Sequence, residues 1–275
     1  VVFAPSKEYQ LEAGDQGVAG RLVVRYDVDR QGQDSEVQVI DGYFVHYFVP
    51  ANLPTLSKHV LFVLDTSGSM VGEKIRQLKD AMFTVLDDLK ESDLFNIIAF
   101  SDGTSYCAGE TFTAGLNVTD LEPFMFPATE ENKGRAITSV LGLEARGGTN
   151  VNDAMLAAMA AARDAAKRES LPDNVKSMVV FLTDGNPSVG VIDNEEIKRN
   201  IKKSNEDLGI PVFTIAFGSD TDVDLLQDIS SENHAISKRI YEGSDAALQL
   251  EDFYTQISSP LLSNLRLQYV GGLMD

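Results

Sequence analysis

One stretch of sequence decides the fold: Val60-Leu61-Phe62-Val63-Leu64-Asp65-Thr66-Ser67-Gly68-Ser69. Its first five residues form an uninterrupted apolar run, which is typical of a strand that is covered on both faces. Polar residues follow at once, and the segment from Gly72 to Lys90 then repeats apolar side chains at the 3.6-residue period of a one-sided surface helix. The stretch therefore predicts a buried strand, a polar loop and an amphipathic helix in succession.

The same alternation continues through most of the chain. Nearly continuous apolar runs predict further buried strands at residues 94–100, 178–182 and 212–217. Amphipathic or alanine-rich patterns predict further helices at residues 152–168, 193–208, 222–229 and 244–257. This alternation predicts an α/β fold with a doubly wound, mostly parallel, Rossmann-like sheet, in which ligands bind beyond the carboxyl ends of the strands.

Other segments do not follow this alternation. Leu22 to Val28 and Val37 to Val49 have the composition of antiparallel strands, and Asp41-Gly42 predicts a bulge or a tight turn within the second. Leu265 to Tyr269 alternates like a half-buried strand, whereas Glu110 to Arg135 has little periodicity and predicts a long irregular segment. We expect the two flanks to form one small antiparallel β module. The predicted organisation is an N-terminal β flank over residues 1–56, an α/β domain over 57–258 and a returning C-terminal strand within 259–275.

The composition argues against several classes of function. The 275 residues carry 23 Lys and Arg against 42 Asp and Glu, a net charge of −19 at pH 7, which disfavours nucleic acid as a partner. No apolar run approaches the roughly 18 residues that a membrane-spanning helix needs. The single cysteine, Cys107, allows neither an intrachain disulfide nor a multi-cysteine metal site. Because the sequence starts at Val1 without an initiator Met or a signal-peptide pattern, we expect a fragment of a longer protein.

Oxygen-bearing side chains follow the predicted strands at the edge where such sheets bind ligands. Asp65, Ser67 and Ser69 occupy alternate positions after the first strand, Asp184 follows the strand at 178–182, and Thr149 precedes the alanine-rich helix. An all-oxygen set suits Mg²⁺, Mn²⁺ or Ca²⁺ rather than zinc or copper, and Mg²⁺ fits best because it binds few carboxylates and keeps waters. These residues together predict a divalent-cation site. Taken alone, the Asp-x-Ser-x-Ser motif would equally fit a helix cap and turn.

Together, these five residues resemble the metal-ion-dependent adhesion site of a von Willebrand factor type A domain, over about residues 57–258. A closer resemblance, to the heavy chains of inter-alpha-trypsin inhibitor, extends across nearly the whole chain. It rests on the segments Asp41 to Phe48, Asp184 to Pro187, Arg239 to Glu242 and Phe253 to Leu262.

The resemblance implies a secreted, extracellular, non-enzymatic adhesion module in a matrix-associated glycoprotein. Heavy chains of this family are joined through chondroitin sulfate to a protease-inhibitor subunit and are transferred onto hyaluronan through a terminal Asp. Asp275 is not expected to be that Asp, because the family's processing sequence does not surround it. The resemblance also implies a protein ligand whose acidic side chain completes the coordination of the metal. In a secreted protein, the sequon at Asn117 becomes a candidate for N-glycosylation.

Two other functions stay open at this point. A magnesium-dependent hydrolase or phosphotransferase would use Asp65 as its nucleophile, but Ser67 stands where haloacid-type phosphotransferases need a second carboxylate. A serine hydrolase would need a histidine base, but His46, His59 and His234 lie in the β flank, at a strand start and in a late loop, where histidines are more often surface or structural residues. The second alternative is a structural matrix module that keeps the metal motif without using it.

Overall fold

The computed structural model describes residues 6–7, 35–48, 56–114, 125–167, 175–218, 221–241 and 245–258. The chain divides into two compact units, Val1–Leu53 and Pro54–Asp275, and each is described by itself. The predicted strands at Leu22 to Val28 and Leu265 to Tyr269 lie outside the described residues, as does Asn117. The predicted domain limits at residues 56 and 258 stay predictions.

The described part of the first unit is a β-hairpin. Strands β1 (Ser35–Ile40) and β2 (Tyr43–Phe48) pair antiparallel, with Ile40 opposite Tyr43. Asp41 and Gly42 have φ angles of 53° and 85°, which are typical of the two central residues of a tight hairpin turn. The segment predicted as one strand over Val37 to Val49 is therefore two strands, and the tight turn is the correct one of the two expected options.

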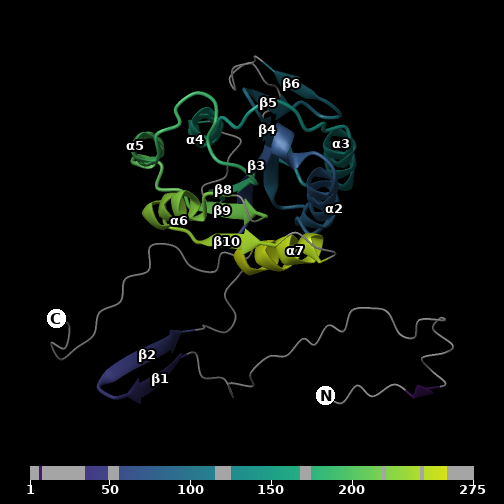
Figure 1. Cartoon of the computed structure of the whole chain (residues 1–275). Coiled ribbons are helices and arrows are strands. Elements are labelled where there is room, and N and C mark those ends of the chain that lie inside the picture. The colour runs from purple at the N-terminus through teal and green to yellow at the C-terminus, as the bar shows by residue number, and fades with distance from the viewer. Residues whose placement is uncertain are drawn as a thin grey trace. The chain divides into compact units, whose positions relative to one another are not determined.

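The second unit contains one eight-stranded sheet (Figure 1). Its strand order is β10-β9-β8-β3-β4-β5-β6, and the short β7 also pairs with β4. The five strands from β10 to β4 run parallel, whereas β5, β6 and β7 pair antiparallel. The prediction of a mostly parallel α/β sheet is therefore confirmed. The strands are β3 (Lys58–Asp65), β4 (Leu94–Phe100), β5 (Thr104–Cys107), β6 (Phe112–Ala114), β7 (Phe126–Pro127), β8 (Lys176–Thr183), β9 (Val212–Phe217) and β10 (Ser237–Ile240).

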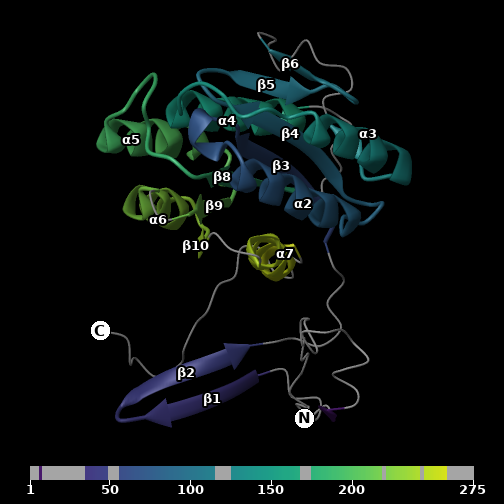
Figure 2. The same cartoon turned by 45° about the vertical axis from the view of Figure 1, so that its right-hand side comes forward.

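Helices cover both faces of this sheet (Figures 1 and 2). One buried apolar cluster joins the sheet to α2, α3 and α7, and a second joins its other face to α4, α5 and α6. Because both faces are covered, the central strands consist of almost only apolar residues. The helices are the short 3₁₀ helix η1 (Gly68–Met70), α2 (Glu73–Asp87), α3 (Glu130–Leu141), α4 (Val151–Lys167), α5 (Asn194–Asn205), α6 (Val223–Glu232) and α7 (Ala246–Ile257). Among the described residues, no helix is long and apolar enough to cross a lipid bilayer.

The prediction of an irregular segment from Glu110 to Arg135 is wrong in part, because this segment contains β6, β7 and the start of α3. Helix α3 is capped by Thr129, whose side chain accepts a hydrogen bond from the backbone N–H of Asn132 at 3.3 Å. Only two apolar residues of α3, Ala136 and Val140, are fully buried. A stripe this short leaves little periodicity in the sequence.

Strand β3 occupies the point where the strand order reverses. Its neighbours are β4 on one side and β8 on the other, and both pairings are parallel. At such a point the connections leave the strand ends toward opposite faces of the sheet, and a crevice forms at the carboxyl edge. Asp65 is the last residue of β3, so the first predicted metal ligand lies at this edge.

Candidate metal centre

The loop after β3 folds around the side chain of Asp65, which is fully buried. Its Oδ1 accepts a hydrogen bond from the backbone N–H of Ser67 at 2.7 Å, and its Oδ2 accepts one from the hydroxyl of Thr183 at the end of β8. Burial raises the pKa of Asp65 to about 6, although the hydrogen bonds from Thr183 and Ser67 act in the opposite direction. The carboxylate is therefore held in place but poorly solvated.

Two serine hydroxyls connect this loop to the loop after β8. The Oγ atoms of Ser67 and Ser69 lie 2.9 Å apart, and the Ser69 hydroxyl donates to Asp184 Oδ1 at 2.7 Å. Ser67 and Asp184 are each only 1% exposed, whereas Ser69 is exposed. The oxygens of Ser67, Ser69 and Asp184 thus form a hydrogen-bonded row beside Asp65, with Ser69 on the solvent side.

Backbone hydrogen bonds place the loop that carries Thr149 beside the same edge. The N–H of Gly68 donates to the carbonyl of Gly147 at 2.9 Å, and the N–H of Arg146 donates to the carbonyl of Thr66 at 2.8 Å. A Cβ atom added at Gly185 would lie 3.2 Å from Thr149 Oγ1 and 3.4 Å from Ser69 Oγ. Gly185 therefore keeps open a space bordered by both hydroxyls. The structure brings all five predicted residues to one edge.

Three further residues of this edge were missed by the sequence analysis. Thr183 donates to Asp65, as described above, and its position directly before Asp184 could have identified it as a residue of the site. Lys74, in the first turn of α2, donates from Nζ to Asp184 Oδ2 at 2.7 Å. Asp102, between β4 and β5, accepts from the N–H of Gly148 at 2.7 Å and so fixes the loop before Thr149. No sequence pattern marks Asp102, because its contact spans 46 residues.

The side chains at this edge fit a hard divalent cation. Within the described residues, no group of three or more His, Cys, Asp or Glu side chains is arranged to hold a metal. The edge instead offers two carboxylates and three hydroxyls, and two of these hydroxyls border the space that Gly185 keeps open. Few carboxylates and an all-oxygen environment suit Mg²⁺, which retains part of its water shell, better than the nitrogen and sulfur sites that zinc prefers.

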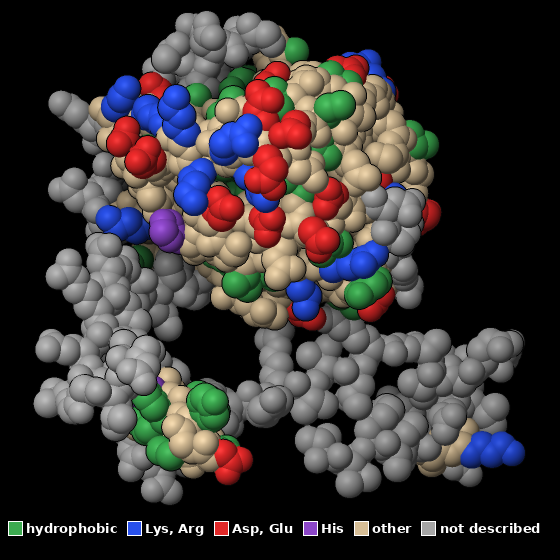
Figure 3. Space-filling view, turned by 60° about the vertical axis from the view of Figure 1, so that its left-hand side comes forward, with side chains coloured by type: hydrophobic (Ala, Val, Ile, Leu, Met, Phe, Trp, Pro, Cys, Tyr) green, Lys and Arg blue, Asp and Glu red, His purple; other side chains and the backbone are tan. Residues whose placement is uncertain are grey.

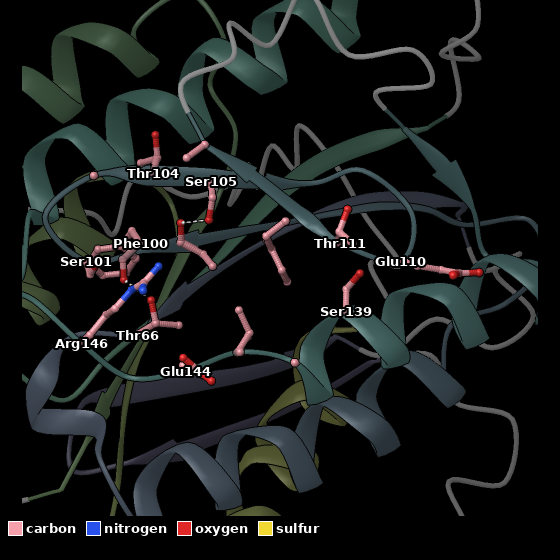
Figure 4. A pocket seen from close by; sticks show the side chains of 16 residues that line it. Thr66, Phe100, Ser101, Thr104, Ser105, Glu110, Thr111, Ser139, Glu144 and Arg146 are labelled. Carbon is pink, nitrogen blue, oxygen red and sulfur yellow. Dashed lines mark hydrogen bonds between the residues drawn. The ribbon is translucent and has the colours of Figure 1, made fainter.

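A polar cavity of about 490 Å³ lies next to the loop after β3 (Figure 4). Thr66, Ser101 and Arg146 lie together at one end of it, and Glu110 and Ser139 lie toward the other end. Thr66 stands between two of the predicted metal ligands, and its hydroxyl donates to the Phe100 carbonyl at 2.9 Å. The wall of the cavity and the candidate metal centre therefore share one loop.

Comparison with known proteins assigns the class of this fold. Residues 59–256 match the family model of the von Willebrand factor type A domain, so the chain belongs to that family. Its curated relatives are heavy chains of inter-alpha-trypsin inhibitor, and the chain is homologous to them. It is 39% identical to heavy chain H4 of Bos taurus and 38% identical to heavy chain H6 of Homo sapiens, in each case over 100% of this chain. It spans 29% and 20% of the lengths of these two relatives.

Solved structures agree on the fold. A von Willebrand factor type A protein from Catenulispora acidiphila matches with a TM-score of 0.58 and 17% identity, covering 76% of this chain and 43% of that one. Proximal thread matrix protein 1 from the mussel byssus, in a structure described as having a zinc-occupied MIDAS motif, matches with a TM-score of 0.52 and 15% identity, covering 72% and 47%. The family model and the heavy-chain relatives confirm both family resemblances inferred from the sequence.

Proposed function

We propose that this chain is a non-enzymatic adhesion module that holds a divalent cation and uses it to bind an acidic side chain of a protein or matrix ligand. The metal ligands would be Asp65, Ser67, Ser69, Thr149 and Asp184. One observation carries the proposal: two buried carboxylates, Asp65 and Asp184, are connected through Ser67 and Ser69 by hydrogen bonds at the switch point of the sheet. Buried carboxylates are costly unless a cation compensates them, and a dication at this edge would do so.

The exposure of the edge favours binding of a second protein. Ser69 is exposed while the carboxylates behind it are buried, so a bound cation could be reached from solvent. Mg²⁺ keeps coordination positions that water fills, and a carboxylate from a partner can replace such a water. The mussel protein, whose structure is described with a zinc-occupied MIDAS motif, supports the view that this fold can hold a divalent cation. Mg²⁺ is the proposed ion, with Mn²⁺ or Ca²⁺ as alternatives.

The homology also supports a biological setting for this module. We infer that it is part of a secreted, extracellular protein of the heavy-chain type, linked to hyaluronan matrix through chondroitin sulfate-containing complexes. On the face formed by α5 and α6, basic side chains alternate with acidic ones (Figure 3). Two of these cations are paired, Lys198 with Asp228 at 2.8 Å and Lys202 with Glu232 at 3.3 Å. This mixed surface favours a protein ligand at the metal over noncovalent binding of a polyanion on this face.

The geometry argues against an enzyme. Asp65 is 0% exposed and accepts hydrogen bonds at both oxygens, so it is poorly placed to attack a substrate as a nucleophile. His59 is buried near the amino end of β3, opposite the end that carries Asp65. A structural matrix module that does not use its metal motif is the second candidate, and metal titration separates it from the first.

Isothermal titration of Mg²⁺ and Mn²⁺ into metal-stripped protein tests the proposal. We expect binding of about one equivalent in the parent and none in the Asp184→Asn variant, with circular dichroism showing an intact fold in both. Asp80→Asn is the matched control, because Asp80 is an exposed carboxylate on α2 that pairs with Arg76. It should bind as the parent does. Failure of the parent to bind either metal, even with acetate present as a soluble carboxylate, would refute the adhesion-site proposal.

A further inference from the structure

Lys74 forms an ion pair inside the candidate metal centre. Its Nζ lies 2.7 Å from Asp184 Oδ2, and the two side chains are 15% and 0% exposed. The other oxygen of the same carboxylate, Oδ1, accepts the Ser69 hydroxyl. Both oxygens of Asp184 therefore have a hydrogen-bond donor, and one of these donors carries a full positive charge.

The position of Lys74 in its helix is electrostatically unfavourable. It is the second residue of α2, where the exposed N–H groups of the helix carry partial positive charge and favour an anion such as Glu73. An ammonium in the first turn loses free energy from this effect. The ion pair with Asp184 compensates for that loss, so the charge of Lys74 is directed at the metal centre rather than at its own helix.

We propose that Lys74 is an internal counter-ion that lowers the affinity of the centre for its cation until a partner supplies a carboxylate. The inference rests on the proposed function of the site. Asp65 and Asp184, when ionised, together with the ammonium of Lys74, give the centre a net charge of −1, so a bound dication would leave it at +1. Like charges repel across the poorly solvated edge, which weakens metal binding. The residual positive charge attracts an anionic partner, so metal and partner bind cooperatively.

Metal titrations of charge variants test this role. Lys74→Met removes the charge and keeps an unbranched side chain, and we expect it to bind Mg²⁺ and Mn²⁺ at least about tenfold more tightly than the parent. Lys74→Arg keeps the charge and should stay within about threefold of the parent. Lys79→Met is the matched control: Lys79 lies on the same helix but donates to the Leu141 carbonyl, so its loss should leave metal affinity unchanged.

Thermal unfolding separates this role from a purely structural one. Without Lys74, Asp184 is a buried charge lacking a counter-ion, so the Lys74→Met variant should melt below the parent in EDTA and gain more from Mg²⁺. Equal loss of stability with and without Mg²⁺, together with unchanged metal affinity, would overturn the proposal. If Lys74→Met does not fold, Lys74→Gln provides the same test, because its amide can still donate to Asp184.

Acetate, a soluble carboxylate, tests whether the metal and an anionic partner bind cooperatively. Replacing chloride by acetate should tighten Mn²⁺ binding in the parent more than in Lys74→Met, since the parent keeps the extra positive charge. An equal effect in both proteins would overturn the cooperative role. Absence of metal binding in the parent and in every variant would refute the metal site itself, whereas parent binding that Lys74→Met does not change would refute only the role of Lys74.

Discussion

Replacement of Asp65 by asparagine should stabilise the metal-free protein while abolishing metal binding. Asp65 is fully buried, and burial raises its pKa from 3.8 to about 6. A rise of this size corresponds to about 3 kcal/mol of destabilisation at neutral pH, where the carboxyl is ionised in both states. The ionised carboxyl destabilises the fold because the folded state holds the proton of Asp65 more tightly than the unfolded state does. Folding therefore becomes less favourable as pH rises from about 4 to 6, and asparagine does not carry this penalty.

The hydrogen bonds of Asp65 reduce the expected gain. The amide oxygen of asparagine can still accept from the N–H of Ser67, but an NH₂ group replaces the oxygen that accepts the Thr183 hydroxyl. Because the raised pKa already includes the hydrogen bonds to the charged oxygens, asparagine loses only the value of a neutral hydrogen bond, about 1 kcal/mol. The net stabilisation should then be about 2 kcal/mol, or a rise of about 4–8 °C in melting temperature for a domain of this size.

Urea and thermal unfolding near pH 7 provide the assay, in EDTA and in saturating Mg²⁺. In EDTA the Asp65→Asn variant should be more stable than the parent. In Mg²⁺ only the parent should gain stability, because only the parent is expected to bind the ion. Asp80→Asn, at an exposed site on α2, controls for the loss of a negative charge alone. A variant less stable than the parent in EDTA would refute the reasoning, because the burial penalty would then be smaller than the value of the carboxylate's hydrogen bonds.

Other predictions concern the space at the metal edge, a buried ion pair and a buried histidine. Gly185→Ala should weaken Mg²⁺ binding measured by titration, with little change in unfolding free energy, because its Cβ would fill the space beside Thr149; unchanged affinity would contradict this. Asp93→Asn should cost about 3–5 kcal/mol in urea unfolding without changing metal affinity, because it leaves the buried ammonium of Lys58, 2.5 Å away, without a counter-charge. Burial lowers the pKa of His59 from 6.5 to about 4, so unfolded His59 binds the proton first. This histidine alone should contribute a loss of about 3 kcal/mol in stability from pH 6.5 to 4, opposite in sign to the contribution of Asp65, and His59→Gln should lack it.

The central strands were the most predictable part of the fold. The runs at residues 94–100 and 212–217 coincide with β4 and β9, because strands covered on both faces leave uninterrupted apolar sequence. Strand β10 was missed, since its sequence Ser-Lys-Arg-Ile contains only one fully buried residue, Ile240. A strand that pairs on one side at the end of the sheet needs few apolar residues, so its pattern is weak.

Some residues of the candidate site could likewise be predicted from the sequence, and others could not. Asp65, Ser67, Ser69 and Asp184 could be predicted because each lies at the end of a strand that is obvious in the sequence or within four residues of it, and the carboxyl edge of a parallel sheet gathers such positions. Lys74 could not be assigned from its helix pattern alone, because its partner Asp184 is 110 residues away. Which cation neutralises which carboxylate depends on how neighbouring loops pack, and sequence periodicity carries no information about that.

The arrangement of charges explains why strand β3, which is apolar from Val60 to Leu64, ends in a carboxylate. An apolar residue at position 65 would continue the run from Val60 to Leu64 in a position that is 0% exposed, with no desolvation penalty. The chain instead places a carboxylate there, beside a second one at Asp184, and only one of the two has a lysine 2.7 Å away. The metal-free edge therefore holds one more buried negative charge than its own cation can neutralise. In the proposed function, a bound dication would reverse this imbalance, and the charge that remained would favour an anionic partner over water at the open position.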